Sequence, residues 1–379
     1  MRRSTQKILT THVGSLPGRR DSFVNGDDAG LSEAVCEAIA RQRDIGIDVI
    51  NEGEFTKGGD WLSYIDGRLG GFEQTAEPRD ASLLRGKDRE TFADFYKFAS
   101  ERGTLFYNPK DKPLVVRKHW VCTGPVTYAR KDELQKEVDL FAAALSKSGR
   151  DKRDCFFTAT APSSLEPYLT NAYYGSAEEF IVALAEAMRV EYETIADAGF
   201  IVQVDDAWLA ALWDRIGIPM GLEAFRKYCL LRVEALNHAL SSIPEERIRY
   251  HLCWGSWHGP HAYDLPLRDL VDVLLRVKAQ AYLIEGANPR HEHEYHVWES
   301  VRLPAGKILI PGVVAHSTDI VEHPELVSER LQRYTRILGK ENVMAGTDCG
   351  FGERTHPQIA WAKLSSLVQG AELASRVLF

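Results

Sequence analysis

Four residues in this sequence are best suited to chemistry. His251 and Cys253 are separated by one position, and Glu285 and Cys349 follow later in the chain. Imidazole, thiolate and carboxylate groups are all ligand types that zinc accepts. Each residue lies at the end of a short apolar run that predicts a strand. Because residues i and i+2 of a strand face the same side, His251 and Cys253 can point into one cavity. We therefore expect separate strand ends to converge on one zinc ion.

A less specific interpretation stays open for these residues. Buried cysteines commonly fill core positions, and a His-x-Cys motif carries little weight alone. The histidine-rich run at residues 291–296 also has metal-ligand types. It lacks the spacing that puts two imidazoles on one helical face, so we expect a solvated or substrate-gating loop there, with a rival metal site as the second interpretation.

Three further polar residues follow apolar runs: Glu54, Asp205 and His316. Asp205 begins a carboxylate pair that could hold an amine or a proton, whereas Asp206 could simply cap the next turn. Glu52 and Glu54 share one strand face. His316 could act as a general acid or base because imidazole titrates near neutral pH. A turn-capping role is the simpler explanation for any one of them, but many polar strand ends together favour an active site.

The elements that would position these residues alternate along most of the chain. Apolar runs predict strands at residues 8–15, 48–51, 155–160, 200–204, 248–253, 281–285, 308–314 and 342–345. Helical spacing predicts helices at residues 31–45, 177–198, 222–240, 267–277, 324–338 and 357–377. This alternation predicts a parallel (β/α)8 TIM barrel, an α/β fold whose functional side chains lie at the carboxyl ends of the strands.

Residues 69–114 break the alternation, because they are rich in glycine and charged residues with interspersed aromatic residues. We expect an insertion here, after the second strand, that carries a helix. A strand pair is expected across residues 114–116 and 120–122, near the barrel mouth. Residues 1–379 would then form a single zinc-dependent barrel domain.

The composition fits a globular protein that acts on small molecules. The 379 residues are 44% hydrophobic, and a net charge of −8 with both signs interspersed predicts neither nucleic-acid nor membrane binding. No apolar run approaches the roughly 18 residues that span a bilayer, and no signal peptide is evident, so we expect a cytoplasmic protein. Six scattered cysteines favour reduced thiols over disulfides. Assembly into a homo-oligomer stays open.

Taken together, these segments resemble the catalytic barrel of cobalamin-independent methionine synthase and, more loosely, the related epoxyalkane:coenzyme M transferase. The similar segments run in order along nearly the whole chain: residues 13–17 (VGSLP), 52–55 (EGEF), 161–162 (AP), 203–206 (QVDD), 251–253 (HLC), 284–285 (IE), 312–317 (GVVAHS) and 348–350 (DCG). The resemblance implies that zinc is held by His251, Cys253, Glu285 and Cys349.

The resemblance also implies roles for the other candidates. Ser15, Glu54 and Asp205 would hold the amino acid or an equivalent thiol substrate. His316 would assist proton movement at the alkyl donor, a task for which Asp205 is the other candidate. Tyr168 stands where the family has a tryptophan that stacks on the folate ring, so the aromatic plane is kept with a different side chain.

The activity implied by the resemblance is that of a zinc-dependent thiol alkyltransferase. Its most direct form is a methyltransferase that moves a methyl group from a methylfolate-like donor to homocysteine or a related thiol. Two departures concern the donor. Methionine synthases of this class usually carry a second, N-terminal barrel that helps to hold the folate tail, and the Asp-Asp-Ala sequence at residues 205–207 replaces their Asp-Glu-Pro.

Two other functions stay open. One is that of an epoxyalkane:coenzyme M transferase (a 2-hydroxyalkyl-CoM lyase), in which a thiolate opens an epoxide. Acidic Glu54 and Asp205 favour a thiol with an ammonium group, whereas the sulfonate of coenzyme M would favour Arg19, Arg20 or Arg130. The alternative of another class is a non-catalytic barrel that binds thiols or zinc, because closed zinc sites do not turn over.

Overall fold

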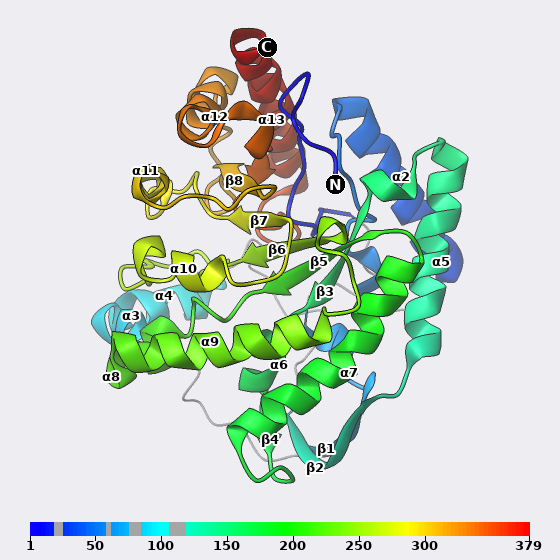
Figure 1. Cartoon of the computed structure of the whole chain (residues 1–379), viewed down its shortest axis with the longest axis vertical. Helices are drawn as coiled ribbons and strands as arrows, with labels where there is room; N and C mark the ends of the chain where they lie inside the picture. The colour runs from blue at the N-terminus through cyan, green and yellow to red at the C-terminus, as the bar shows by residue number, and fades with distance from the viewer. Residues whose placement is uncertain (19–25, 58–61, 76–84, 106–118) are drawn as a thin grey trace.

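The main sheet of the protein is parallel and curved. The computed structural model describes residues 1–18, 26–57, 62–75, 85–105 and 119–379. Within these residues the sheet has the spatial order β3-β5-β6-β7-β8-β9. The strands are β3 (Phe156–Thr160), β5 (Ile201–Asp206), β6 (Ile248–Leu252), β7 (Ala281–Ile284), β8 (Ile308–Val314) and β9 (Gly346–Thr347). Figure 1 shows the sheet in the middle of the molecule with long helices around it.

The side chains of these strands alternate between two apolar cores. In β7, Tyr282 and Ile284 pack in the large core between the sheet and the helices, whereas Ala281 and Leu283 belong to a smaller core on the inner face. The period of two follows from strand geometry, and burial of both faces explains the nearly continuous apolar runs. Towards the carboxyl ends the inner face becomes polar, so the candidate site lies on top of the smaller core.

Two short extended segments lie beside the edge strands of this sheet. Thr10 forms a parallel bridge with Ala345, and Ile50 forms one with Cys155, which directly precedes β3. The backbone N–H of Val49 donates to the carbonyl of Thr10 at 3.0 Å. The fold is therefore α/β, with a curved parallel sheet whose two edges are both extended by N-terminal segments.

The described residues form six long helices, five of which match the predicted helical spacing. They are α2 (Asp28–Ile45), α5 (Lys131–Ser148), α7 (Ala177–Asp197), α9 (Leu222–Ala239), α12 (Pro324–Leu338) and α13 (Pro357–Leu378). Their starts follow local chemistry: Ser176 accepts a hydrogen bond from the N–H of Glu179, and proline occupies the first position of α12 and α13. Four shorter helices lie between the strands of the described part of the main sheet: α6 (Pro162–Leu165), α8 (Ile218–Met220), α10 (Val271–Leu274) and α11 (Val297–Ser300).

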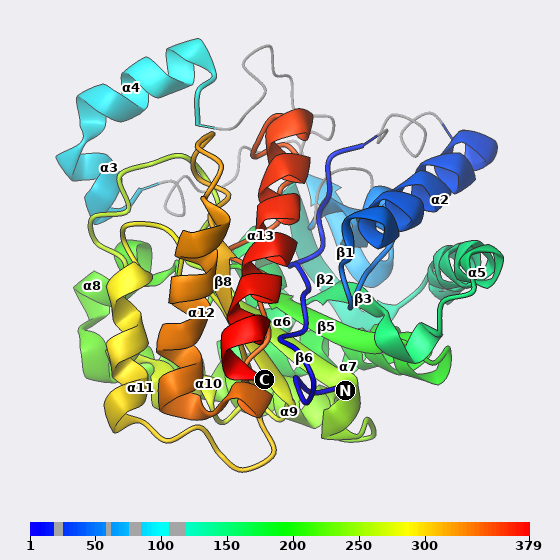
Figure 2. The same ribbon diagram turned by 90° about the horizontal axis from the view of Figure 1, so that it is seen from above.

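The region predicted as an insertion supplies a helical pair and one strand, β1 (Leu69–Thr75), of a second, smaller sheet. Strands β1, β2 (His119–Tyr128) and β4 (Leu169–Asn171) form a sheet of order β1-β2-β4, in which β1 and β2 are antiparallel. Helices α3 (Lys87–Thr91) and α4 (Ala93–Arg102) lie at the outer edge of the molecule (Figure 2). The strand expected at residues 114–116 lies outside the described residues, and residues 120–122 pair with β1 and β4.

Several sequence predictions differ from the structure. The strands expected at residues 8–15 and 48–51 are extended segments with isolated bridges at Thr10 and Ile50. Helix α5 was missed, because its apolar residues are interspersed with seven charged ones in an 18-residue helix. The helix expected at residues 267–277 is reduced to a 3-10 turn and the four-residue α10. The last strand is β9, at residues 346–347; in the predicted range, Val343 and Ala345 make only isolated bridges.

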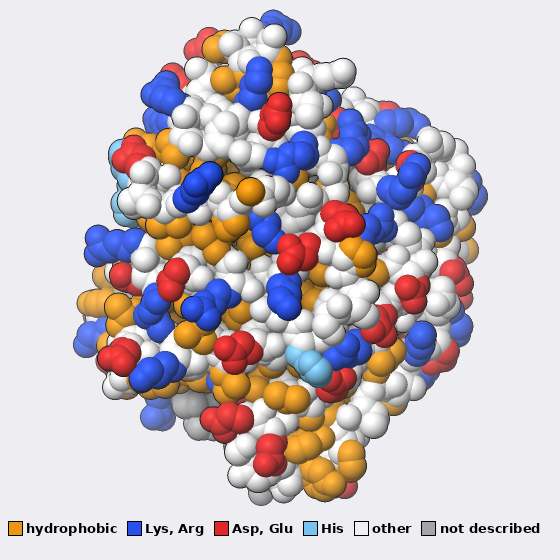
Figure 3. Space-filling view, viewed as in Figure 1, with side chains coloured by type: hydrophobic (Ala, Val, Ile, Leu, Met, Phe, Trp, Pro, Cys, Tyr) orange, Lys and Arg blue, Asp and Glu red, His pale blue; other side chains and the backbone are white. Residues whose placement is uncertain are grey.

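The surface matches the mixed charge pattern of the sequence. Basic and acidic side chains are interspersed over the face of the molecule shown in Figure 3. Among the described residues, no helix is both long enough and apolar enough to cross a lipid bilayer.

Candidate metal centre and active site

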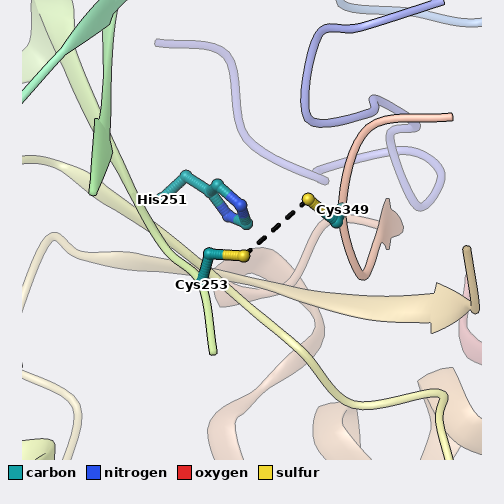
Figure 4. Close-up of side chains that lie close together, drawn as sticks. All are labelled: His251, Cys253 and Cys349. Atoms are coloured by element: carbon teal, nitrogen blue, oxygen red, sulfur yellow. Dashed lines mark hydrogen bonds between the residues drawn. The ribbon is translucent and has the colours of Figure 1, made fainter. Parts of the chain in front are cut away.

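His251, Cys253 and Cys349 lie together at the carboxyl edge of the sheet. His251 is in β6, Cys253 directly follows that strand, and Cys349 follows β9. One ligand atom from each residue lies within 4.8 Å of the others, and the two sulfur atoms are 3.9 Å apart. Figure 4 shows the three side chains pointing toward one another. Residues about a hundred positions apart thus meet as the strand-end argument predicted.

The geometry of this cluster fits a tetrahedral zinc ion. With Zn–S bonds of about 2.3 Å and tetrahedral angles, two cysteine ligands are held about 3.8 Å apart. Both ring nitrogens of His251 are buried and have no oxygen or nitrogen partner among the described residues; although burial lowers the pKa of the ring, the Cys349 thiolate raises it. Burial without a partner is costly for an imidazole, so a ligand for this ring is the simplest explanation.

The two cysteines differ in how easily they ionise. Hydrogen bonding to Cys253 lowers the pKa of Cys349 well below its ordinary value, although burial acts in the opposite direction. The same contact, together with burial, raises the pKa of Cys253. The backbone N–H of Gly255 also donates to the sulfur of Cys253 at 3.2 Å. The pair therefore holds one thiolate readily, and a cation is needed to hold two.

Glu285 is held beside the cluster by other partners. Its carboxylate accepts hydrogen bonds from the backbone N–H of Trp254 at 3.0 Å and from the side chain of Asn288 at 2.8 Å. It is not part of the group of ligand atoms that lie within 4.8 Å of one another. Burial raises the pKa of Glu285 to about 7. Its role as a fourth ligand stays a prediction.

Asp348 fixes the loop that carries Glu285, although sequence reasoning did not single it out. Its two oxygens accept from the backbone N–H groups of Gly286, Ala287 and Asn288 at 2.8–2.9 Å, and from the Asn288 side chain at 3.0 Å. Asp348 is completely buried. The sequence offered two signals for this arrangement: a carboxylate residue directly before Cys349, and an asparagine three residues after Glu285.

The residues predicted to hold the substrate lie at the same edge. A Cβ atom at Gly14 would stand 2.3 Å from Oε1 of Glu54, so glycine is needed for the approach of the two segments. Glu54 itself has a φ of 60°, a conformation that is rare without a structural or functional reason. Ser15 packs against Gly350, next to Cys349: a Cβ at Gly350 would lie 2.6 Å from that of Ser15.

Asp205 is buried and electrostatically linked to Glu54. Burial, followed by the charge of Glu54, raises the pKa of Asp205 to about 7. Its Oδ1 accepts from Gln203 at 2.6 Å, and the buried Arg249 donates to Gln203 at 2.6 Å. Asp206, in contrast, accepts from the N–H of Leu209 at 3.1 Å, which confirms the interpretation that it caps the following turn.

His316 lies beside the cluster in a neutral form. Burial lowers its pKa to about 4, although the Cys349 thiolate raises it. Its Nδ1 is buried and has no hydrogen-bond partner in the described part of the chain. The hydroxyl of Thr355 donates to the backbone carbonyl of His316 at 3.0 Å, which fixes the strand end.

Tyr168 stands in a neighbouring loop and contacts another aromatic residue. Its ring meets Trp208 edge-on with the centroids 5.6 Å apart, and the guanidinium of Arg215 lies 4.6 Å from the Trp208 ring. Trp208 and Arg215 were not predicted as site residues. The structure therefore places Tyr168 in a group of flat side chains rather than directly on the His251 cluster.

The expectation of a solvated loop at residues 291–296 is wrong for two of its residues. Residues 292–296 form a 3-10 helix, and His291 and Glu294 are buried. Both nitrogens of His291 are used: Nδ1 contacts Glu294 at 2.8 Å and Nε2 contacts Asp264 at 3.2 Å. This pairing also leaves no ring nitrogen of His291 for a metal.

Of the three arginines considered for a sulfonate, Arg130 alone is among the described residues. Arg19 and Arg20 lie outside the described residues. Arg130 precedes α5, has 49% of its side chain exposed, and pairs with Asp132 and Glu133 of the same helix.

These features define an α/β protein with a histidine–dithiol cluster and buried carboxylates at the carboxyl edge of a parallel sheet. Comparison with known protein families agrees with this description of the site. Residues 173–373, just over half of the chain, match the family described as "Cobalamin-independent synthase, Catalytic domain", and the chain belongs to this family.

Individual relatives are distant. A methionine synthase of Thermococcus kodakarensis is 23% identical over 58% of this chain and 57% of its own length, so the chain spans less than two thirds of that relative. A methionine synthase of Saccharolobus solfataricus is 25% identical over 79% and 80%, respectively. A 2-hydroxypropyl-CoM lyase of Xanthobacter autotrophicus is 23% identical over 56% and 60%.

The same fold occurs in a solved structure. A B12-independent methionine synthase from Shewanella sp. W3-18-1, solved with selenomethionine, superposes with a TM-score of 0.69 at 16% identity, over 98% of this chain and 99% of that chain. At this identity the likeness establishes a shared fold.

Proposed function

We propose that the chain is a zinc-dependent thiol methyltransferase on one (β/α)8 barrel. Its substrates would be a thiol amino acid of the homocysteine type and a methylfolate-like donor. The observation that carries the proposal is the convergence of His251, Cys253 and Cys349 at the carboxyl edge of the sheet in a member of this family. Residues 1–379 would form one domain, with residues 69–114 as its insertion.

The closed barrel is supported by the bridges at the two sheet edges. The segment around Thr10 pairs with Ala345 beyond β8, and the segment around Ile50 pairs with Cys155 at the start of β3. A hydrogen bond joins Val49 to Thr10. With these two segments as strands, the six-stranded sheet becomes a cycle of eight, which is the strand number of this barrel.

The metal would be held by His251, Cys253 and Cys349, with Glu285 as an exchangeable fourth ligand. When bound, zinc would lower the pKa of the substrate thiol, so that the thiol loses its proton while the substrate sulfur stays nucleophilic. The hydrogen bonds from Trp254 and Asn288 to Glu285 give this carboxylate a resting place away from the cluster. The substrate sulfur can then take its position.

Glu54 and Asp205 would bind the ammonium group of the amino acid. Their mutual repulsion contributes to the raised pKa of Asp205, and a cation between them would relieve it. Ser15, which packs next to Gly350, would contribute a hydrogen bond to the same substrate. This acidic pair favours an amino acid over coenzyme M, whose charged group is a sulfonate.

In the transfer step the substrate sulfur forms a bond to the methyl carbon while the bond from that carbon to the donor nitrogen breaks. The electron pair of the broken bond passes to nitrogen, which must receive a proton. His316, neutral at pH 7, can first accept the proton that the thiol releases and then, as an imidazolium, donate that proton to this nitrogen. The number of protons is conserved over the cycle.

The proposal is tested by an alkylation assay. The purified chain, loaded with one equivalent of zinc, is incubated with homocysteine and 5-methyltetrahydrofolate in its mono- and triglutamate forms, and methionine is measured. We expect methionine formation, with kcat at least tenfold lower in His316→Asn at unchanged zinc content. An unchanged kcat in this variant would remove the proton role of His316.

The likeness to a 2-hydroxypropyl-CoM lyase supports a second candidate function. The same assay is therefore run with coenzyme M and propene oxide. Formation of the hydroxyalkyl thioether in place of methionine would establish the epoxide reaction. Failure of every thiol and donor pair to react would leave a zinc- or thiol-binding protein and contradict both enzymatic functions.

A further inference from the structure

Helices α3 and α4 are tied to the loops that follow β5 and β6. Asp88 in α3 is buried, with 2% of its surface exposed. Its backbone N–H donates to Asp214 at 2.9 Å, and its carboxylate accepts from the N–H of Ala262 at 2.9 Å and from the hydroxyl of Tyr96 at 2.6 Å. One residue thus joins α4, the segment after β5 and the loop after β6.

Tyr96 extends this connection to a tryptophan. Its hydroxyl accepts a hydrogen bond from Nε1 of Trp257 at 3.1 Å while it donates to Asp88. Burial and the bond to Asp88 raise the pKa of Tyr96, so the hydroxyl keeps its proton and both hydrogen bonds persist at neutral pH. Asp88 and Tyr96 therefore help to orient the Trp257 indole, whose ring also packs on His261 with the centroids 4.2 Å apart.

Trp257 belongs to a stack of flat side chains. The guanidinium of Arg215 lies between two indoles, 5.1 Å from the Trp257 ring and 4.6 Å from the Trp208 ring. Tyr168 contacts the same group through Trp208, whose ring it meets edge-on. Arg215 lies in a five-residue π-helix, Trp213–Gly217, a distortion that is frequent at functional sites.

The stack borders the metal cluster through the loop after β6. Trp257 follows Cys253 by four residues, and its ring packs so closely on Gly255 that a Cβ there would lie 1.9 Å from it. The N–H of Gly255 donates to the sulfur of Cys253. The same short loop thus contacts the reactive sulfur cluster at one end and carries the indole at the other.

We propose that Asp88 and Tyr96 are positioning residues that hold Trp257 against Arg215 and Trp208, and that this stack is the wall on which the alkyl donor lies. The proposal rests on the methyltransferase function and specifies how this chain recognises its donor. The insertion thereby becomes an element of substrate recognition.

The chemistry of the stack favours one class of donor. Indole and guanidinium planes attract a flat, conjugated ring system, and the cation adds attraction for an acidic group on it. Nε1 of Trp208 is buried and has no acceptor among the described residues, so it can donate to a ring carbonyl or ring nitrogen. A small epoxide offers neither a plane nor a charge, and would gain little from this wall.

The test separates donor binding from thiol binding and from the metal. Wild type, Tyr96→Phe and Asp88→Asn are compared for zinc content, calorimetric Kd of homocysteine, and kcat and KM with 5-methyltetrahydrofolate. Tyr96→Phe loses the hydrogen bond from Trp257, and Asp88→Asn replaces one of the two oxygens that accept from Tyr96 and Ala262 with an NH2 group, so we expect the donor KM to rise about fivefold to tenfold. Zinc content, thiol Kd and kcat at saturating donor should stay within twofold of wild type.

Thr91→Val is the matched control. The hydroxyl of Thr91 donates to Tyr263 at 3.1 Å, so it joins the same two segments at an exposed position without touching the stack. This variant should keep the wild-type donor KM. An equal rise in the control would mean that any contact between these segments matters and would contradict a specific role for Asp88 and Tyr96.

Three results would overturn the inference. They are an unchanged donor KM in both variants, a parallel loss of thiol binding or zinc, and wild-type turnover of propene oxide but not of methylfolate. If Asp88→Asn does not fold, Tyr96→Phe decides, because it keeps the aromatic ring. If wild type turns over no substrate pair, the methyltransferase function fails, and calorimetry of 5-methyltetrahydrofolate with wild type and Tyr96→Phe still decides whether the stack binds the donor.

Discussion

At the scale of single residues, the environment decides which cysteines can bind a metal. Cys155 and Cys229 are buried among apolar groups, and burial raises the pKa of each to about 12, so they remain thiols. Cys349 is different, because its contact with Cys253 and His251 lowers its pKa. The surroundings of these cysteines thus distinguish buried structural thiols from candidate metal ligands.

Replacement of Cys253 or Cys349 by serine should abolish zinc binding. Each variant removes one of two thiolates from a site that requires both, so we expect about one zinc per chain in wild type and less than about a tenth of that in either variant. Metal content is measured by mass spectrometry after dialysis against a weak chelator. Cys229→Ser, a buried cysteine remote from the cluster, should keep its zinc; full metal in both ligand variants would refute the assignment.

At the scale of elements, the loop after β7 is shaped by the segment after β9. Asp348 accepts four hydrogen bonds from residues 286–288, and these groups would otherwise be buried without partners. Asn288 then holds Glu285. The position of the candidate fourth ligand therefore depends on a carboxylate that follows a different strand and does not itself belong to the cluster.

Asp348→Asn should destabilise the protein and weaken its metal site. The amide can replace only one of the two accepting oxygens and places a donor against backbone N–H groups, which predicts a loss of about 2–4 kcal/mol in the free energy of unfolding. Urea unfolding at saturating zinc and a zinc titration measure both effects. Asp319→Asn, a surface change, serves as the control. Wild-type values for Asp348→Asn would show that the loop holds its shape without this carboxylate.

At the scale of the whole molecule, buried charges link stability to pH. Burial opposes the charged form of His291, but hydrogen bonds to Asp264 and Glu294, with the charge of Glu285, more than offset it and raise the pKa of His291 to about 10. Asp264 is shared with His261, whose pKa is also raised. This group connects the loops after β6 and β7.

The contribution of His291 to stability should be lost at alkaline pH. Its pKa is above the ordinary value of 6.5, so the stabilisation is fully present below about pH 6.5 and disappears as the pH rises toward about 10. Urea unfolding between pH 6.5 and 9.5 should show a steeper decline for wild type than for His291→Gln. His293→Gln, at an exposed position, should keep the wild-type slope, and identical slopes for all three proteins would contradict the charged pairing.

The alternation of apolar runs and helical spacing was enough to predict the strands that carry the site and most of the long helices. This succeeded because strands buried on both faces must be apolar, and because polar residues at their ends stand out against such runs. His251 and Cys253 could be placed on one face from strand geometry alone. Helix α5 and strands β1 and β4 of the smaller sheet escaped prediction, because their exposed faces are as polar as loops, whereas the strand expected at residues 120–122 is part of β2.

Tertiary structure alone decided what depends on contacts between distant segments. The sequence by itself determined the ligand types and their places at strand ends; folding decided that His251, Cys253 and Cys349 form one cluster while Glu285 is held by Asn288. It also brought Asp88 under the loop after β6. The physical reason is that spacing along a strand fixes which way a side chain points, whereas the curvature of the sheet and the packing of its loops decide which side chains meet.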